Sequence, residues 1–314
     1  KSKKKMFSIV FPGQGSQKIG MVKEFYEKYD LAKQIFKDAD AILNVPITKI
    51  IFEGPDNQLN LTENTQPAIF LASYCIFEII KKEFGYDFKK FKYFAGHSLG
   101  EYSALACVGS MSFEDTLKIL QKRGKFMQEA VPSGEGAMLV VLGISSKELD
   151  KILKENKDKY ECFIANDNSQ LQVVVSGLKK DINLLSDDLN NKKIKNLKLN
   201  VSAPFHCKYM KKASERIATF INDLKINELK KPIISNVTAK ETSSSKEIKS
   251  LLISQIEKKV RWRECVEYMT NNGVKNFVEI GPGKVLSGLI KRINKNVSVS
   301  SINNEEDIKL LIND

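Results

Sequence analysis

The chain has 314 residues, of which 42% are hydrophobic and 28% charged, and a formal net charge of +12 at pH 7. This size and composition predict a large hydrophobic core, in one domain or in one domain with an insertion. No apolar run approaches the ~20 residues that a membrane-spanning helix needs. No helix-turn-helix pattern or aromatic–basic module accompanies the positive charge, which argues against nucleic-acid binding.

The net charge and the cysteine pattern limit which binding partners and which cellular compartment the sequence fits. A lysine-rich surface favours acidic partners, although the lysine- and asparagine-rich composition of the whole chain explains the charge equally well. The five cysteines are scattered without a C-x-x-C pair, which predicts reduced thiols and indicates neither a metal site nor a disulfide framework. No signal peptide is visible and the first residue is not Met, so a targeting segment that has been removed is compatible with the sequence.

The first expected element is an apolar strand at residues 7–11, followed by the turn Pro12-Gly13-Gln14-Gly15-Ser16-Gln17. This turn lacks the third glycine of a dinucleotide-binding turn and the Lys-Ser/Thr of a P-loop, which argues against nucleotide binding. Gln14 lies between two glycines, and its amide group is suited to donate to an oxyanion.

Helices are expected at residues 24–43 and 67–84, with a short helix or turn at 47–52. The helix at 67–84 is apolar around most of its circumference, so we expect it to be buried. Thr62 is its expected N-cap.

The stretch Gly96-His97-Ser98-Leu99-Gly100 has the form G-x-S-x-G. An expected strand at 91–95 precedes it and an expected helix at 101–108 follows it. In that setting the sharp turn exposes the serine hydroxyl and directs the helix N-terminus toward an oxyanion; the alternative is an ordinary turn with an incidental serine. Adjacent residues of such a turn point apart, so His97 is not expected to be the base for Ser98.

Ser112 is expected to cap a helix at 113–130 that carries Arg123. A mid-helix arginine usually lies on a solvated face. The alternative is an inward guanidinium that holds a carboxylate through two parallel hydrogen bonds.

After a linker at 132–136 the chain shows a pattern of its own. The expected elements follow the order strand, helix, strand, strand, helix, strand, at residues 137–144, 146–155, 160–165, 170–176, 179–191 and 195–201. This βαββαβ order is that of the ferredoxin-like motif, so we expect a ferredoxin-like inset domain at 132–199 within a large α/β domain formed by 1–131 and 200–314. The segment 166–169 is expected to be a turn, either of an ordinary hairpin or one that places Asn166 at the cleft between the domains.

The sequence contains two histidines, so candidates for a base near neutral pH are few. His206 lies in a loop before an expected helix at 208–223. A base in a loop far after the nucleophile fits the chain order of sheet enzymes with a serine nucleophile, and a structural loop histidine is the alternative.

The remaining elements are expected to complete the sheet. Strands are expected at 233–237, 276–280 and 297–302, with 297–302 as the last strand, and helices at 246–258, 262–272 and 284–294. Gly281-Pro282-Gly283 is interpreted as a sheet-end turn because it has a single G-x-G and a proline.

Five motifs, in one order across nearly the whole chain, resemble those of the malonyl-CoA:acyl-carrier-protein transacylase family of dissociated (type II) fatty-acid synthesis. They are Pro12-Gly13-Gln14-Gly15-Ser16-Gln17, Gly96-His97-Ser98-Leu99-Gly100-Glu101-Tyr102, Gln121-Lys122-Arg123-Gly124, Ala203-Pro204-Phe205-His206 and Glu279-Ile280-Gly281-Pro282-Gly283. The resemblance implies a hydrolase-like parallel-sheet α/β domain with a ferredoxin-like inset.

The resemblance also implies roles for particular residues. Ser98 would be the nucleophile and His206 its base, with Gln14 and the backbone N–H of Leu99 as the oxyanion hole and Arg123 holding the malonyl carboxylate.

Three further positions follow from the resemblance. Gln255 matches the residue whose main-chain carbonyl orients the histidine, so the family pattern is a dyad without a buried acid. Asn166 matches a position that approaches the substrate cleft, and Phe205 resembles the malonyl-selective form of the acyl-selecting position.

The implied substrates are a coenzyme A thioester and an acidic acyl carrier protein that carries phosphopantetheine, with no cofactor or metal on this chain and a monomeric state. Lys208, Lys211 and Lys212 could flank the cleft mouth as contacts for that carrier. Alternatives are a serine thioesterase or esterase, an acyltransferase domain of a polyketide synthase, and a non-enzymatic carrier-binding module. A bacterial cytoplasm and a plastid-type organelle are both compatible with the sequence.

Overall fold

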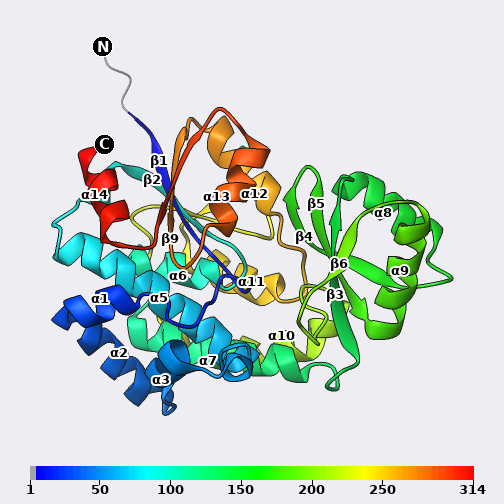
Figure 1. The fold of residues 1–314 in the computed structure, drawn as a ribbon, viewed down its shortest axis with the longest axis horizontal. Coiled ribbons are helices and arrows are strands. Elements are labelled where there is room, and N and C mark those ends of the chain that lie inside the picture. The colour runs from blue at the N-terminus through cyan, green and yellow to red at the C-terminus, as the bar shows by residue number, and fades with distance from the viewer. Residues whose placement is uncertain (1–4) are drawn as a thin grey trace.

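The computed structural model describes residues 5–314, and its main feature is a six-stranded sheet in the order β10-β9-β1-β2-β7-β8 (Figure 1). All neighbouring strands are parallel except β7 and β8, which pair antiparallel at one edge. The strands are β1 (Phe7–Phe11), β2 (Phe91–Gly96), β7 (Ile233–Ile234), β8 (Glu241–Thr242), β9 (Asn276–Ile280) and β10 (Ser298–Ile302). The predicted parallel-sheet α/β core is therefore present.

Both faces of this sheet are covered, as the short apolar strands require. Alternate residues of β1 enter different cores: Ile9 and Phe11 join the larger one and Val10 the smaller. The smaller core lies under α12 (Trp262–Asn271) and α13 (Val285–Ile293).

The larger core is formed with most of the other helices of this part of the chain. They are α1 (Lys23–Lys28), α2 (Asp30–Leu43), α3 (Ile47–Glu53), α4 (Asp56–Leu59), α5 (Thr62–Lys82), α6 (Gly100–Cys107), α7 (Phe113–Glu129), α10 (Lys211–Asp223), α11 (Ser245–Gln255) and α14 (Glu305–Asn313). Short 3₁₀ turns occur at Phe88–Lys90 and Lys208–Met210. Helix α5 is buried along most of its length, as predicted.

A second sheet of four strands projects to one side of the molecule (Figure 1). Its order is β4-β5-β3-β6 and every neighbouring pair is antiparallel. Its elements are β3 (Gly136–Leu142), α8 (Ser146–Glu155), β4 (Cys162–Ser169), β5 (Gln172–Leu178), α9 (Lys179–Asn191) and β6 (Asn196–Lys198). The predicted element order is present, with β6 shorter than expected.

The small sheet lies between its own helices and the rest of the chain. Leu139 and Val175 pack in a core with α8 and α9, whereas Met138 and Val174 belong to the larger core. One face of the small sheet is thus fixed against the large sheet's helices.

Strand β4 also pairs directly with the segment before α12. The Val260 N–H donates to the Ala165 carbonyl at 2.7 Å, and the Asp167 N–H donates to the Val260 carbonyl at 2.9 Å. Arg263 then binds both carboxylate oxygens of the buried Asp167, at 3.1 and 2.9 Å. The prediction of a turn at 166–169 was wrong because these pairings hold the segment in strand conformation, and the chain reverses after Ser169 instead.

Two helix predictions differ most from the structure. The helix expected at 24–43 is broken at Tyr29, whose backbone is extended (φ −115°, ψ 125°) and whose hydroxyl donates to Glu305 at 2.8 Å. The helix expected from residue 67 begins at Thr62, so Pro67 lies inside it and Leu61 is the N-cap. The Thr62 hydroxyl donates to the Gln128 side chain at 2.8 Å instead of capping the helix.

The C-terminal part of the chain also differs from expectation in two places. Strand β7 ends at Ile234, because the Ser235 carbonyl and hydroxyl bind the following turn. The last strand is confirmed as β10, and α14, which was not expected from the sequence, follows it with a capping box between Asn304 and Asp307.

Within residues 5–314, no helix is both long and apolar enough to cross a membrane. The same part of the chain contains no group of three or more His, Cys, Asp or Glu side chains arranged to hold a metal ion.

Candidate active site

The G-x-S-x-G stretch forms the sharp turn between β2 and α6. Ser98 has φ +54°, a left-handed conformation that a non-glycine residue adopts only when its surroundings enforce it. The flanking glycines are required by close contact: a Cβ on Gly96 would lie 1.9 Å from the Gly100 carbonyl, and one on Gly100 would lie 2.4 Å from the Phe11 carbonyl oxygen. The strand, turn and helix predicted around Ser98 are confirmed.

Ser98 and His206 lie within hydrogen-bond distance although 108 positions separate them. The Ser98 Oγ is 2.8 Å from His206 Nε2, and His206 Nδ1 is 2.8 Å from the main-chain carbonyl of Gln255. A carbonyl only accepts, so Nδ1 carries the proton and Nε2 presents its lone pair to the serine hydroxyl.

The His206 imidazole is held in its neutral form. Burial lowers its pKa to about 3, and the positive charge of Arg123 acts in the same direction. The imidazole therefore stays unprotonated and able to accept a proton through neutral and mildly acidic pH.

Arg123 is fully buried and points inward, so the usual expectation of a solvated arginine is wrong and the inward alternative is confirmed. Its Nη1 donates to Gln66 Oε1 at 2.9 Å, and its Nη2 donates to Gln255 Oε1 at 2.9 Å and to Ser98 Oγ at 3.2 Å. Its Nε has no partner, and the guanidinium forms no ion pair within the described chain. A buried cation held by neutral amides is electrostatically suited to receive an anion.

The backbone amides at the turn leave one donor free. The Ser98 N–H donates to Asn236 Oδ1 at 2.8 Å, and the Gly100 N–H donates to the His97 carbonyl at 2.9 Å. The Glu101 N–H donates to the Ser98 carbonyl at 3.1 Å. The Leu99 N–H has no acceptor among residues 5–314, which leaves it available to an oxyanion at the N-terminus of α6.

The Gln14 turn lies against this same site. A Cβ on Gly13 would be 2.5 Å from the His97 carbonyl oxygen, so the two loops touch. Ser16 Oγ donates to the Gly13 carbonyl at 2.8 Å and the Gly15 N–H donates to Gln17 Oε1 at 2.7 Å, which fixes the turn. The Gln14 side chain is half-buried and makes no hydrogen bond within the described chain.

The other sequence-predicted residues lie around this centre. Asn166 is on β4 with its Nδ2 3.5 Å from His97 Nε2, which brings the small sheet to the serine turn without contact to Ser98 itself. Phe205 is buried in the larger core beside His206 in the chain. His97 Nε2 lies 2.8 Å from Asn168 Oδ1, so His97 faces the small sheet and not the Ser98 hydroxyl, as expected.

Three buried residues of the site were not singled out from the sequence: Gln66, Glu101 and Asn236. Burial raises the pKa of Glu101 to about 8. Glu101 directly follows the G-x-S-x-G stretch, which was a usable signal, whereas Gln66 and Asn236 are uncharged residues whose importance depends on contacts with distant segments.

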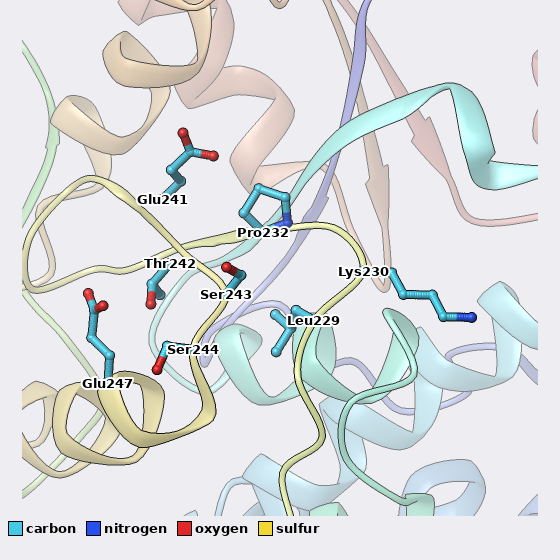
Figure 2. Close-up of a pocket in the computed structure, with 8 residues that line it drawn as sticks. All are labelled: Leu229, Lys230, Pro232, Glu241, Thr242, Ser243, Ser244 and Glu247. Atoms are coloured by element: carbon cyan, nitrogen blue, oxygen red, sulfur yellow. The ribbon is translucent and has the colours of Figure 1, made fainter.

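A surface pocket of ≈ 350 Å³ lies at the β8 edge of the large sheet (Figure 2). Its lining residues are Leu229, Lys230, Pro232, Glu241, Thr242, Ser243, Ser244 and Glu247. It includes none of the residues predicted for the site.

A serine on a strained strand-to-helix turn, a histidine within hydrogen-bond distance of its hydroxyl and an available N–H at the adjoining helix N-terminus are the arrangement found in enzymes that transfer acyl groups through a serine. The acyl transferase domain family model matches residues 8–310, and the chain belongs to this family. It is 41% identical over 308 residues to the malonyl CoA-acyl carrier protein transacylase of Bacillus subtilis, covering 97% of this chain and 96% of that protein.

Solved structures of related proteins have the same fold as this chain. The acyl-carrier-protein-S-malonyltransferase of Bartonella henselae superposes with a TM-score of 0.94 at 38% identity, covering 98% of each chain. A malonyl-transacylase solved in complex with its type II PKS acyl-carrier protein gives a TM-score of 0.94 at 37% identity, covering 98% of this chain and 100% of that one.

Proposed function

We propose that this protein transfers a malonyl group from malonyl-CoA to the phosphopantetheine thiol of an acyl carrier protein and so supplies fatty-acid elongation. The observation that carries this proposal is the buried Arg123, whose guanidinium lies 3.2 Å from the Ser98 hydroxyl without a carboxylate partner. A dyad that hydrolysed neutral esters would have no use for this cation.

In the first half-reaction, His206 Nε2 accepts the Ser98 proton as Oγ attacks the thioester carbonyl. Negative charge develops on the carbonyl oxygen, where the Leu99 N–H and the Gln14 amide donate hydrogen bonds; one such donor contributes about 3 kcal/mol to the transition state. His206 then returns the proton to the departing coenzyme A thiolate, which leaves a malonyl ester on Ser98.

In the second half-reaction the carrier's thiol attacks the malonyl-Ser98 carbonyl. His206 takes the thiol proton, the same donors hold the oxyanion, and the proton passes to Ser98 Oγ as the ester bond breaks. Both half-reactions use one set of groups in reverse order, which predicts ping-pong kinetics. The chain needs no cofactor of its own because the partner carries the phosphopantetheine.

Arg123 selects the acyl group in this scheme. A malonyl carboxylate supplies the anion that the guanidinium lacks, whereas an acetyl group leaves a buried cation unpaired. We assign Phe205 and Asn166 to the walls of the acyl and cleft sites and the Gln255 carbonyl to the orientation of His206, in line with their burial and contacts.

We further propose that residues 132–199 form a ferredoxin-like inset domain in a hydrolase-like large domain of residues 1–131 and 200–314. The antiparallel order β4-β5-β3-β6, with α8 and α9 sharing one core, supports this division. The bacterial relatives support a bacterial cytoplasm, with a plastid-type organelle as the second possibility, and a monomer is the proposed state.

For the acidic carrier, the proposed docking region is the groove of ≈ 620 Å³ beside His206, which Lys208 lines. Lys208 pairs with Glu161 and Lys211 with Glu215, so part of the charge expected at the cleft mouth is already neutralised within the chain. Lys157, Lys258 and Lys259 line the same groove and contribute further positive charge.

The test is a transfer assay with malonyl-CoA and holo-carrier protein, followed by mass analysis of the carrier. We expect malonyl-carrier to form with the wild type and neither with Ser98→Ala nor with a carrier that lacks phosphopantetheine. Release of free malonate at an equal rate with or without carrier would instead identify a thioesterase.

A further inference from the structure

Asn236 lies in the turn after β7 and is fully buried. Its side-chain Oδ1 accepts the Ser98 N–H at 2.8 Å and the Gln255 Nε2 at 3.1 Å, and its Nδ2 donates to the Gly96 carbonyl at 2.8 Å. One carboxamide therefore binds the backbone on both sides of His97 and the side chain of a third segment.

The main chain of Asn236 is held as firmly as its side chain. Its N–H donates to the buried side-chain carboxyl group of Glu101, on the first turn of α6, and its carbonyl accepts the Arg261 N–H at 3.1 Å. Asn236 thus connects the end of β7, the serine turn, the start of α6 and the segment before α12, and each of its polar atoms has a partner.

Gln255 links Asn236 to the other residues of the site through hydrogen bonds. Its main-chain carbonyl holds His206 Nδ1, its Oε1 accepts from Arg123 Nη2, and its Nε2 donates to the Ser98 carbonyl as well as to Asn236. Gln255 therefore contacts Ser98, His206 and Arg123 at once. Asn236 is the buried side chain that holds Gln255 against the serine turn.

We propose that Asn236 is a positioning residue for acyl transfer, which fixes Ser98 in its left-handed conformation and aligns Gln255, and through it His206 and Arg123. By engaging the Ser98 N–H, Asn236 also leaves the Leu99 N–H as the backbone donor that an oxyanion meets. This inference rests on the proposed acyl transfer but concerns a residue that does not touch the substrate.

The first test is Asn236→Ala, with the rate constant and the final extent of malonyl-enzyme formation followed by rapid quench and intact mass. Loss of hydrogen bonds to the nucleophile's backbone predicts that the rate constant falls about 10- to 100-fold. The final extent of acylation should stay unchanged, because every folded molecule still acquires one malonyl group. A residue needed only for folding would lower the extent, through an inactive fraction, and leave the rate constant of the folded fraction intact.

The second test is Asn236→Asp, which keeps the shape of the side chain. A protonated carboxyl presents both an acceptor and a donor, as the amide does, whereas the ionised form has no hydrogen for the Gly96 carbonyl. The acylation rate relative to wild type should therefore be higher at low pH and fall as pH rises. Glu101 from α6, Arg123 from α7, Cys265 from α12 and His206 face this region, and dividing by the wild-type rate at each pH removes their own titrations.

Ser235→Ala is the matched control. Ser235 is the adjacent buried residue, and within residues 5–314 its hydroxyl binds only the N–H groups of Val237 and Thr238. We expect the acylation rate constant of Ser235→Ala to equal that of the wild type.

Two results would overturn the proposal: an acylation rate in Asn236→Ala equal to that of the wild type, or equal pH profiles for Asn236→Asp and the wild type. If the alanine variant does not fold, the aspartate comparison decides alone. Failure of the wild type itself to form a malonyl-enzyme would instead overturn the proposed function.

Discussion

Arg123 Nη2 and Ser98 Oγ lie 3.2 Å apart, so the cation that we propose to select the acyl group and the oxygen that we propose to attack it are direct neighbours. The guanidinium is held by two glutamines, which fix its plane without neutralising its charge. An incoming carboxylate therefore finds a rigid cation with few competing anions.

Replacing Arg123 should remove the preference for malonyl-CoA. In Arg123→Ala the carboxylate of the substrate enters a buried site without a partner, which corresponds to a loss of about 3–4 kcal/mol or roughly 10²- to 10³-fold in kcat/KM. Steady-state transfer with malonyl-CoA measures this. Lys125→Ala, on the exposed side of the same helix, should retain full activity. Equal kcat/KM for the two variants would contradict the assigned role of Arg123.

The acid limb of the pH profile should lie far below that of an ordinary histidine. The pKa of His206 is lowered to about 3, mainly by burial, so the free enzyme keeps its neutral base as the pH falls from 7 to 5. If the pKa were about 6.5, kcat/KM would fall about 25-fold between pH 7 and pH 5. A midpoint near 6.5 in kcat/KM would contradict the buried, neutral base.

The lowered pKa of His206 also makes the stability of the fold depend on pH. Below pH 6.5 an unfolded His206 binds a proton while the folded one does not, so protons favour the unfolded state. The free energy of unfolding should therefore decrease as the pH falls below 6.5 and be independent of this residue above it. Urea titrations of wild type and His206→Ala at pH 5 and pH 8 measure this contribution: the variant should lose less stability on acidification, and an equal loss would contradict the prediction.

Gly281 should be required for the Gln14 turn. It has φ +151°, and a Cβ there would lie 2.5 Å from Pro12 Cγ and 2.6 Å from Ser73 Oγ. Gly281→Ala should lower the free energy of unfolding by more than about 1 kcal/mol and slow acylation by displacing the residues next to Gln14.

Gly288 offers the matched control because its Cβ would meet nothing within 4 Å and it lies inside α13. Gly288→Ala should stabilise the protein by about 0.5–1 kcal/mol and leave acylation unchanged. Denaturant titration and burst kinetics on both variants test the pair; a neutral Gly281→Ala would show that the turn tolerates displacement.

The ion pair between Arg263 and Asp167 should fix the small sheet. Asp167 is buried and has its carboxylate bound at both oxygens, so Arg263→Ala should cost about 3 kcal/mol by leaving that charge without its partner. Lys151→Ala, which breaks an exposed pair with Glu155, should change stability by less than about 0.5 kcal/mol. Equal effects in urea titrations would contradict the prediction.

The sequence predicted what depends on local pattern. The short apolar strands, the helix that Ser112 caps and the turn around Ser98 follow from periodicity, capping and glycine spacing, and the structure confirms them. The order of elements in the small sheet was equally readable, because each strand and helix carries its own pattern.

What the sequence did not predict depends on contacts between distant segments. Asn166 and its neighbours look like turn residues, but pairing with Val260 makes them strand. Tyr29 lies in an amphipathic run, but its extended backbone and its bond to Glu305 interrupt the helix. Asn236 carries no pattern at all, since its partners come from β2, α6 and α11.

The most direct test of the central claim is intact-mass analysis of the protein after mixing with malonyl-CoA in the absence of carrier. Wild type should acquire one malonyl adduct, located on Ser98 by peptide mapping, and lose it when holo-carrier protein is added; Ser98→Ala should acquire none. An unmodified wild type that still transfers malonyl groups, or an adduct on another residue, would contradict the acyl-serine mechanism.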